Sequence, residues 1–162
     1  MKKLCRGQGL VLAVFVCIVL GVAAAPCLAQ EIDPELMDML GKHDQALSEQ
    51  DLATVMATYA PQGSIVLMGT GPGERWVGKE EIEDAYMHFF QDFDPGSLST
   101  ECTWNSMDAR GNIAWAMIMC HFTDFLKNQK REYAINISAV LEKLEGQWYF
   151  RTFHFSNLTG GQ

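Results

Sequence analysis

The stretch Gly146-Gln147-Trp148-Tyr149-Phe150-Arg151-Thr152-Phe153-His154-Phe155-Ser156-Asn157 predicts a β-strand with apolar side chains on both faces. Successive side chains of a strand point to opposite faces. Strict alternation therefore puts His154 on the same face as Trp148, Phe150, Thr152 and Ser156. A strand that is apolar on both faces needs cover on each. We expect helices over the face that carries His154, and a second subunit against Phe153 and Phe155.

Three more long strands precede this one, and polar turns separate them. The predicted strands are Leu98–Asp108, Ile113–Phe125 and Tyr133–Leu144, with turns at Ala109–Asn112, Lys127–Lys130 and Glu145–Gln147. Short connections between strands of this length are typical of antiparallel hairpins.

The first half of the chain is predicted to be helical. Apolar residues recur at helical spacing over Glu35–Ser48, Asp51–Tyr59 and Lys79–Phe90, and Asp33-Pro34 supplies a cap and a first-turn proline for the first helix. Ser64–Met68 is predicted as a short strand. Three helices followed by a run of strands predict an α+β fold with the helices on one face of the sheet.

The N-terminus has the pattern of a secretory signal peptide. Basic residues up to Arg6 come before an uncharged apolar run, Leu10–Ala25, and small residues around Ala29 suit cleavage. The predicted divisions are a signal peptide at 1–29, a leader at 30–34, a domain at 35–158 and a tail at 159–162. The alternative is an uncleaved membrane anchor, since the apolar run approaches the length that spans a bilayer.

The net charge of the chain argues against two classes of binding partner. The net charge is −8, and it becomes more negative once Lys2, Lys3 and Arg6 leave with the signal peptide. An acidic domain with no basic cluster argues against nucleic acid, and after cleavage against a membrane surface.

Two cysteines remain after the predicted cleavage, and they form a disulfide candidate. If residue numbers paired across the turn at Ala109–Asn112 sum to about 222, Cys102 and Cys120 face each other. A slip of one residue would place them on opposite faces, so the pairing stays open.

Several motifs resemble the SnoaL-like group of nuclear transport factor 2-like domains. They are Asp51–Ala60, Trp76–Ile82, Gly111–Trp115, Gly146–Trp148 and His154-x-Ser156, and the resemblance covers residues 36–158. The resemblance implies a strongly bent, mixed or antiparallel sheet wrapped around three helices. It also implies a cone with an apolar pocket, and a homodimer joined through the outer face of the sheet.

The resemblance does not extend to the acids of ketosteroid isomerase, which shares the family fold. Its base would fall within Ser64–Met68 and its second acid near Asn136–Ser138, and neither segment contains an acid here. That mechanism needs a carboxylate within reach of the substrate. The isomerase mechanism is therefore disfavoured.

The resemblance and the strand alternation together define a candidate pocket. Its predicted lining is Tyr59, Tyr86, Trp104, Phe122, Asn136 and His154. His154 beside Asn136 is the best catalytic candidate, because an imidazole next to an amide can orient a polar ligand or move a proton. The alternative is that His154 only fixes the end of the sheet and that the aromatic residues are core.

No cofactor or metal is predicted. Gly69–Gly73 lacks the Lys-Ser/Thr that follows a phosphate-binding loop, and we interpret it as a mobile lip of the cone. His43, His88 and His121 show no metal-ligand spacing.

Three functions remain open. The first is an exported protein that binds a small, largely apolar molecule in its cone. The second is an enzyme of isomerase, cyclase or dehydratase type that uses His154. The third is a non-catalytic dimerisation or interaction module whose cavity is filled by its own side chains.

Overall fold

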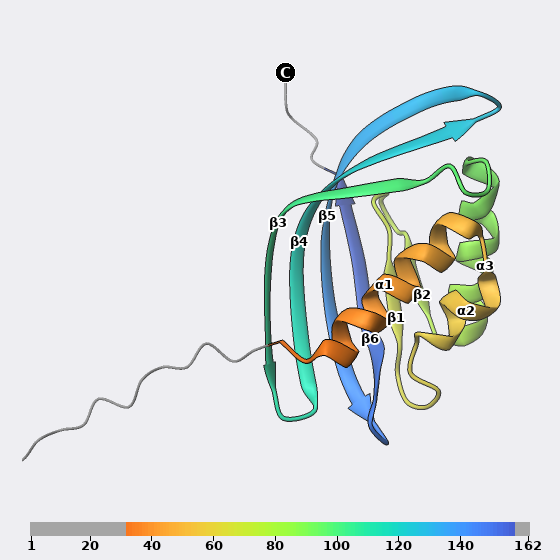
Figure 1. Ribbon diagram of the computed structural model, residues 1–162. Coiled ribbons are helices and arrows are strands. Elements are labelled where there is room, and N and C mark those ends of the chain that lie inside the picture. The colour runs from red at the N-terminus through yellow and green to blue at the C-terminus, as the bar shows by residue number, and fades with distance from the viewer. Residues whose placement is uncertain (1–31, 158–162) are drawn as a thin grey trace, which may run out of the picture.

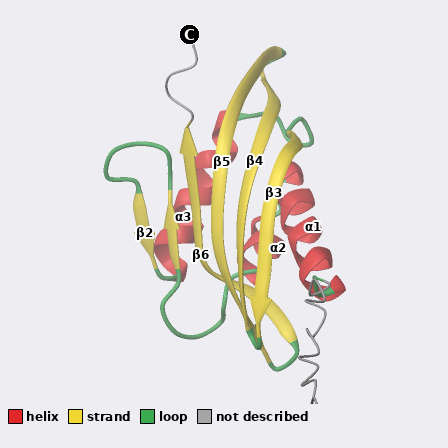
Figure 2. Cartoon of the chain, turned by 90° about the vertical axis from the view of Figure 1, so that its left-hand side faces the viewer, coloured by secondary structure: helices red, strands yellow, loops and turns green. Residues whose placement is uncertain are grey.

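The computed structural model describes residues 32–157, in which three helices pack on one face of a curved, unclosed six-stranded sheet (Figures 1 and 2). The sheet order is β2-β1-β6-β5-β4-β3, with β1 parallel to β6 and the other neighbours antiparallel. The elements are α1 (Pro34–Glu49), α2 (Leu52–Ala57), β1 (Val66–Met68), β2 (Arg75–Val77), α3 (Lys79–Phe89), η1 (Phe90–Asp92), β3 (Ser99–Arg110), β4 (Ile113–Leu126), β5 (Gln129–Leu144) and β6 (Gln147–Asn157). The predicted α+β class is confirmed.

The helices begin where the sequence supplies caps. Asp33 caps α1, accepting a hydrogen bond from the Glu35 amide at 3.0 Å, and Pro34 occupies the first turn as predicted. Asp51 caps α2 in the same way through the Thr54 amide at 3.1 Å. The helices therefore start close to their predicted positions.

The strands differ from the prediction at two places. β5 begins at Gln129 rather than Tyr133, so the polar residues Lys130–Glu132 belong to a strand and pair with the end of β4. The three-residue strand β2 was not predicted, because Arg75-Trp76-Val77 is too short to show apolar alternation along the sequence. It pairs with β1 and completes that edge of the sheet.

A β-bulge in β6 corrects the predicted faces of the last strand. Val140 pairs with Thr152 but Leu141 pairs with Phe150, so Arg151 is an extra residue that reverses the alternation. Phe150 and Phe153 therefore both face the helices, with exposed fractions of 0% and 6%. Phe155 also packs against this core. The expectation that Phe153 and Phe155 face a second subunit, and that His154 faces the helices, is wrong.

The core lies between the helices and the inner face of the sheet, which we define as the face toward the helices. Its largest fully buried side chains include Tyr59, Tyr86, Phe150, Leu36 and Ile82. The outer face of the sheet instead exposes large apolar side chains, among them Trp104, Trp115, Met117, Met119 and Val140. The two faces thus form different environments.

The predicted signal peptide, leader and tail fall almost wholly outside the described residues. Within 32–157, no helix has the length and apolar character needed to cross a membrane.

Candidate functional site

A cavity of about 690 Å³ opens between the inner face of the sheet and α3. Its apolar lining is Leu47, Leu67, Trp76, Ala85, Phe89, Phe122, Ile135 and Phe155, and its polar lining includes Thr70, Glu74, Tyr86, His88, Gln91, Asp92, Arg131, Tyr133 and Asn157. The bent sheet supplies one wall, and the helices with the β1–β2 loop supply the other. The arrangement suits a small molecule with an apolar body.

A pair of buried tyrosines lies at the inner side of this cavity. The hydroxyls of Tyr59 and Tyr86 are 2.8 Å apart, and Tyr86 lines the cavity. Burial raises the pKa of both phenols, so both keep their protons at neutral pH. One hydroxyl proton is donated in the hydrogen bond between the two tyrosines, and the proton of the other hydroxyl can be donated to a ligand oxygen.

His43 lies behind this pair, and its side chain is also buried. The Thr58 hydroxyl donates to the Val55 carbonyl at 2.6 Å, so its oxygen accepts from His43 Nδ1 at 2.9 Å. Nε2 then carries a lone pair, and it has no hydrogen-bond partner within the described chain. Desolvation lowers the pKa of His43 to about 4, so the ring is neutral at pH 7. The spacing of the sequence puts His43 on the apolar side of the first helix, but it did not predict the buried hydrogen bond to Thr58 or the Nε2 without a partner.

An ion pair sits at the mouth of the cavity. Arg131 Nε is 2.7 Å from Asp124 Oδ1 and its Nη2 is 2.9 Å from Oδ2, while the Tyr133 hydroxyl donates to Oδ2 at 3.0 Å. Asp124 is fully buried. Arg131 Nη2 also donates to the Asp92 carbonyl, which ties η1 to the end of the β4–β5 hairpin. Sequence reasoning missed this group because its residues lie on two strands and in a short helix.

The loop between β1 and β2 forms one side of the mouth. Gly69 and Thr70 line the cavity, as expected for a lip of the cone. Glu74 Oε2 accepts from the Gly71 amide at 2.7 Å, and the Gly69 amide donates to the Glu74 carbonyl at 3.0 Å. The Glu74 side chain thus lies across the loop.

The outer face of the sheet carries a second, shallower groove of about 350 Å³. Its lining is Trp104, Met117, Ile118, Met119, Asn136, Ile137, Ser138, His154 and Ser156. His154 Nδ1 lies 3.3 Å from the Ser138 hydroxyl, and the buried Asn136 Oδ1 has no partner within residues 32–157.

The six predicted pocket residues are divided by the sheet. Tyr86 and Phe122 line the cone cavity, and Tyr59 lies directly behind Tyr86. Trp104, Asn136 and His154 come together as expected, but in the outer groove. The bulge at Arg151 moves His154 there, and a bulge beside Thr103 moves Trp104.

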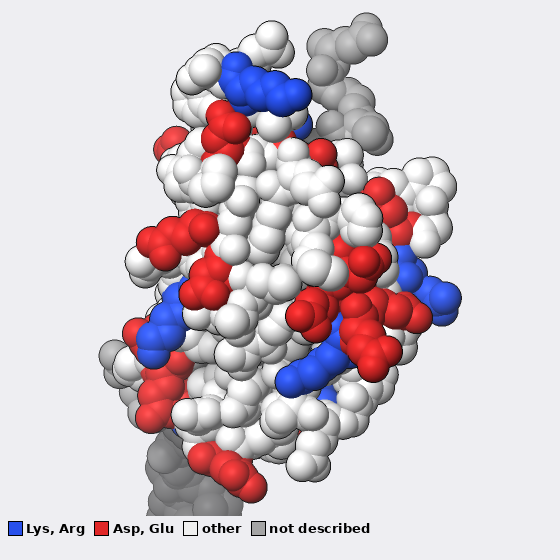
Figure 3. Space-filling model, turned by 90° about the vertical axis from the view of Figure 1, so that its right-hand side faces the viewer, with Lys and Arg blue, Asp and Glu red and all other residues white. Residues whose placement is uncertain are grey.

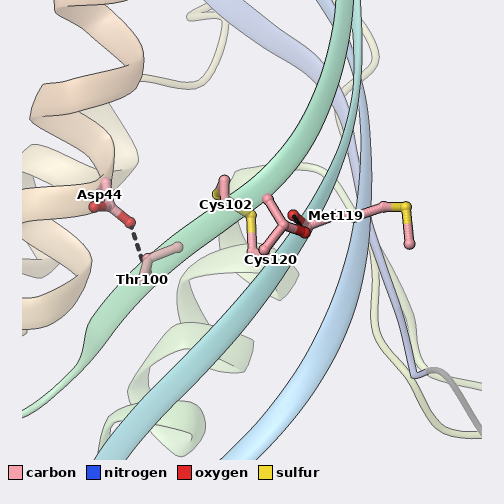
Figure 4. Close-up of a disulfide and its surroundings, with 6 residues drawn as sticks. Asp44, Thr100, Cys102, Met119 and Cys120 are labelled. Carbon is pink, nitrogen blue, oxygen red and sulfur yellow. Dashed lines mark hydrogen bonds between the residues drawn. A yellow bond between two sulfur atoms is a disulfide. The ribbon is translucent and has the colours of Figure 1, made fainter. Parts of the chain in front are cut away.

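Cys102 and Cys120 form a disulfide, with the two residues directly paired across β3 and β4 (Figure 4). Met119, next in sequence to Cys120, points away from the disulfide (Figure 4). No cluster of three or more metal-ligating side chains occurs among the described residues.

Comparison with known proteins places this architecture in a family. A family model for the SnoaL-like domain matches residues 37–159. The chain belongs to the SnoaL-like family. The predicted resemblance is therefore confirmed, and no curated protein matches this SnoaL-like chain.

Solved structures support the same fold at low sequence identity. A putative calcium/calmodulin-dependent protein kinase II association domain from Xanthomonas campestris is 22% identical, with a TM-score of 0.66 and coverage of 78% of this chain and 88% of that one. A putative dehydratase of the NTF2-like family from Streptomyces avermitilis is 11% identical, with a TM-score of 0.68 and coverage of 78% and 95%. An NTF2-like superfamily protein from Salmonella enterica is 16% identical, with a TM-score of 0.66 and coverage of 79% and 95%. At these identities the likeness establishes the fold alone.

Proposed function

We propose that the cone cavity of this SnoaL-like domain binds a small, largely apolar organic molecule. The observation that carries the proposal is the cavity itself, about 690 Å³ with eight apolar lining side chains and the buried Tyr86 in its lining. Ligand pockets commonly measure roughly 300–1,000 Å³ and combine apolar walls with a few polar groups. A module whose own side chains filled the cone would have no space of this size.

The residues that line the cavity support ligand binding rather than catalysis. His154, the predicted catalytic residue, lines the outer groove and not the cone cavity. The Tyr59–Tyr86 pair supplies a neutral hydrogen-bond donor, which suits a carbonyl or hydroxyl oxygen of a ligand. The carboxylates that line the cavity, Glu74 and Asp92, lie at its exposed rim.

Fluorescence of the neutral probe N-phenyl-1-naphthylamine tests this proposal. We expect saturable binding at one site per chain. Thr70→Trp, which places a large ring at the exposed mouth, should weaken binding at least about tenfold, the factor that corresponds to 1.4 kcal/mol. Asn112→Trp, in the exposed β3–β4 turn, is the matched control and should bind as the native protein does. Absence of saturable binding to the native protein would contradict the proposal.

We also infer that two copies associate through the outer face of the sheet. The groove residues on this face include no Asp, Glu, Lys or Arg, and they adjoin exposed Trp115 and Val140. The helical side of the molecule carries many acidic side chains (Figure 3), and the chain is acidic overall. Like charges therefore oppose contacts elsewhere, whereas an uncharged apolar face can pair with its own copy around a two-fold axis.

Matched methionine variants test the association by light scattering at micromolar concentration. The native protein should have the mass of a dimer. Met117→Glu, at an outer-face residue that is 57% exposed, should give a monomer, because it places carboxylates in an apolar contact. Met37→Glu, on α1 and 51% exposed, should remain dimeric. A monomeric native protein would contradict the proposal.

We propose, finally, that residues 1–29 direct export of the chain. The signal-like sequence carries this proposal, and the disulfide supports it, because disulfides persist in oxidising compartments.

A further inference from the structure

Carboxylates outnumber guanidinium and ammonium groups among the side chains around the mouth of the cone cavity. Glu74 and Asp92 contribute carboxylates, Arg131 contributes the guanidinium, and His88 contributes an imidazole. The His88 ring is held at 2.8 Å from the Asp84 carbonyl of its own helix. Which of these groups can meet a ligand depends on the partners that each already has.

The charge of Arg131 is already matched within the protein. Its Nε and Nη2 lie 2.7 and 2.9 Å from the two oxygens of Asp124, which is fully buried. Turning Arg131 toward a ligand anion would leave a buried carboxylate without its counter-charge, which is strongly unfavourable. Among the described lining residues, no Lys or Arg is therefore free to pair with an acidic ligand.

Glu74 lies at the mouth, where the Gly71 amide donates to its Oε2 and two neighbouring glycines leave room for its side chain. A Cβ at Gly69 would lie 2.2 Å from Glu74 Oε2, and a Cβ at Gly71 would lie 2.8 Å from its carboxyl carbon. Neither glycine has a positive φ, so their shared feature is the space that they leave for this carboxylate. Neither Glu74 nor Asp92 forms an ion pair with another described residue.

The cavity lining is also rich in aromatic side chains. Trp76, Tyr86, Phe89, Phe122, Tyr133 and Phe155 all contribute to it. Aromatic faces attract organic cations through their quadrupole, and cages of aromatic side chains recognise quaternary ammonium groups. This observation is independent of the rim charges and favours the same sign of ligand.

Three observations favour a cationic ligand: the carboxylate of Glu74 at the mouth, the pairing of Arg131 with Asp124, and the aromatic lining. We infer from them that the ligand is an organic ammonium ion. Its apolar body lies among the aromatic side chains, and its amine lies near Glu74 and Asp92. The inference rests on the proposed function and names the class of molecule bound at that site.

Three naphthalene probes of similar size but different charge test the inference by isothermal titration calorimetry at pH 7, on the protein without residues 1–29. They are 2-naphthylmethylammonium, 2-naphthylmethanol and 2-naphthoate. The ammonium should bind roughly fivefold more tightly than the alcohol, and the carboxylate most weakly. Carboxylate binding as tight as ammonium binding would overturn the inference and leave the proposed function intact. If none of the three and no N-phenyl-1-naphthylamine binds, the proposed function fails, and the inference fails with it.

Variants of the loop locate the ammonium group. Glu74→Gln should reduce the ammonium preference to about twofold or less and leave the binding of the alcohol unchanged. Gly71→Ala should do the same, because the new methyl group displaces the flexible Glu74 side chain without straining the backbone. Glu83→Gln, on α3 but outside the cavity lining, is the control and should keep the full preference. An undiminished preference in both Glu74→Gln and Asp92→Asn would overturn the assignment to this rim.

Discussion

His43 shows at the scale of one residue how burial decides the role of a titratable group. Its ring centroid lies 4.9 Å from that of Phe150 and 5.3 Å from that of Phe153, and within residues 32–157 the ring forms a single hydrogen bond, to Thr58. A charged imidazole there would lose its hydration without gaining a counter-ion. The sequence predicted a helix with His43 on its apolar side, but two of the rings around it, Phe150 and Phe153, come from β6 at the far end of the chain.

His43 should make the stability of the fold depend on pH. Its pKa is about 4 in the folded protein and 6.5 for the ordinary group, so below pH 6.5 the unfolded chain binds a proton that the folded chain does not. Stability is therefore complete above pH 6.5 and falls toward pH 4, by about 3 kcal/mol at most. Urea unfolding at pH 7.0, 5.5 and 4.5 measures the loss.

His43→Asn is the matched variant for this measurement, because its amide can donate to Thr58 but does not titrate. We expect lower stability at pH 7 and a shallower decline of stability between pH 7.0 and 4.5. Equal slopes for the native protein and the variant would rule out His43 as the cause.

At the scale of elements, two bulges decide which side chains share a face. Paired residue numbers sum to 223 from Arg110–Ile113 to Trp104–Met119, and to 222 at Cys102–Cys120. The extra residue, Thr103, supplies the slip that brings the cysteines together. The sequence left open whether the cysteines pair in the register with a sum of 222, and alternation alone could not locate the bulges, because they depend on pairing with neighbouring strands.

The disulfide joins β3, an edge strand, to the interior of the sheet. Replacing both Cys102 and Cys120 by Ala should lower the free energy of unfolding by about 2–3 kcal/mol, because the closed loop of 18 residues is released in the unfolded chain. Urea unfolding of the variant and the native protein measures this difference. Two free thiols in the native protein without reductant would contradict the pairing.

At the scale of the whole molecule, the sequence predicted the α+β class, the three helices and the order of the long strands. These features follow from local periodicity, caps and turns, which each segment carries by itself. The cavity lining was only partly predicted. Arg131, Glu74 and Asp92 come from separate elements, and which of them meet depends on the curvature of the sheet and not on any spacing along the chain.

If residues 1–29 direct export and are removed, the mass of the remaining chain can be predicted. Cleavage after Ala29 should leave a protein that begins at Gln30, and intact-mass spectrometry with N-terminal sequencing of protein from its own host measures the start. Replacing Ala29 by Phe should slow cleavage, because the processing site needs small residues. A mature protein that keeps Met1 and stays with the membrane would favour the anchor instead.

The extra residue at Arg151 bears on how related sequences are aligned with this one. Arg151 is held by Glu142 at 2.5 Å and by the Gln62 carbonyl, so the side chain itself anchors the irregular position. A relative that lacks one residue there could have the same aromatic residues in the same order. Every later side chain of its strand would nevertheless point to the opposite face of the sheet. An alignment gap of one position at 151 would therefore separate chains in which the histidine equivalent to His154 faces the helices from chains in which Phe153 and Phe155 do.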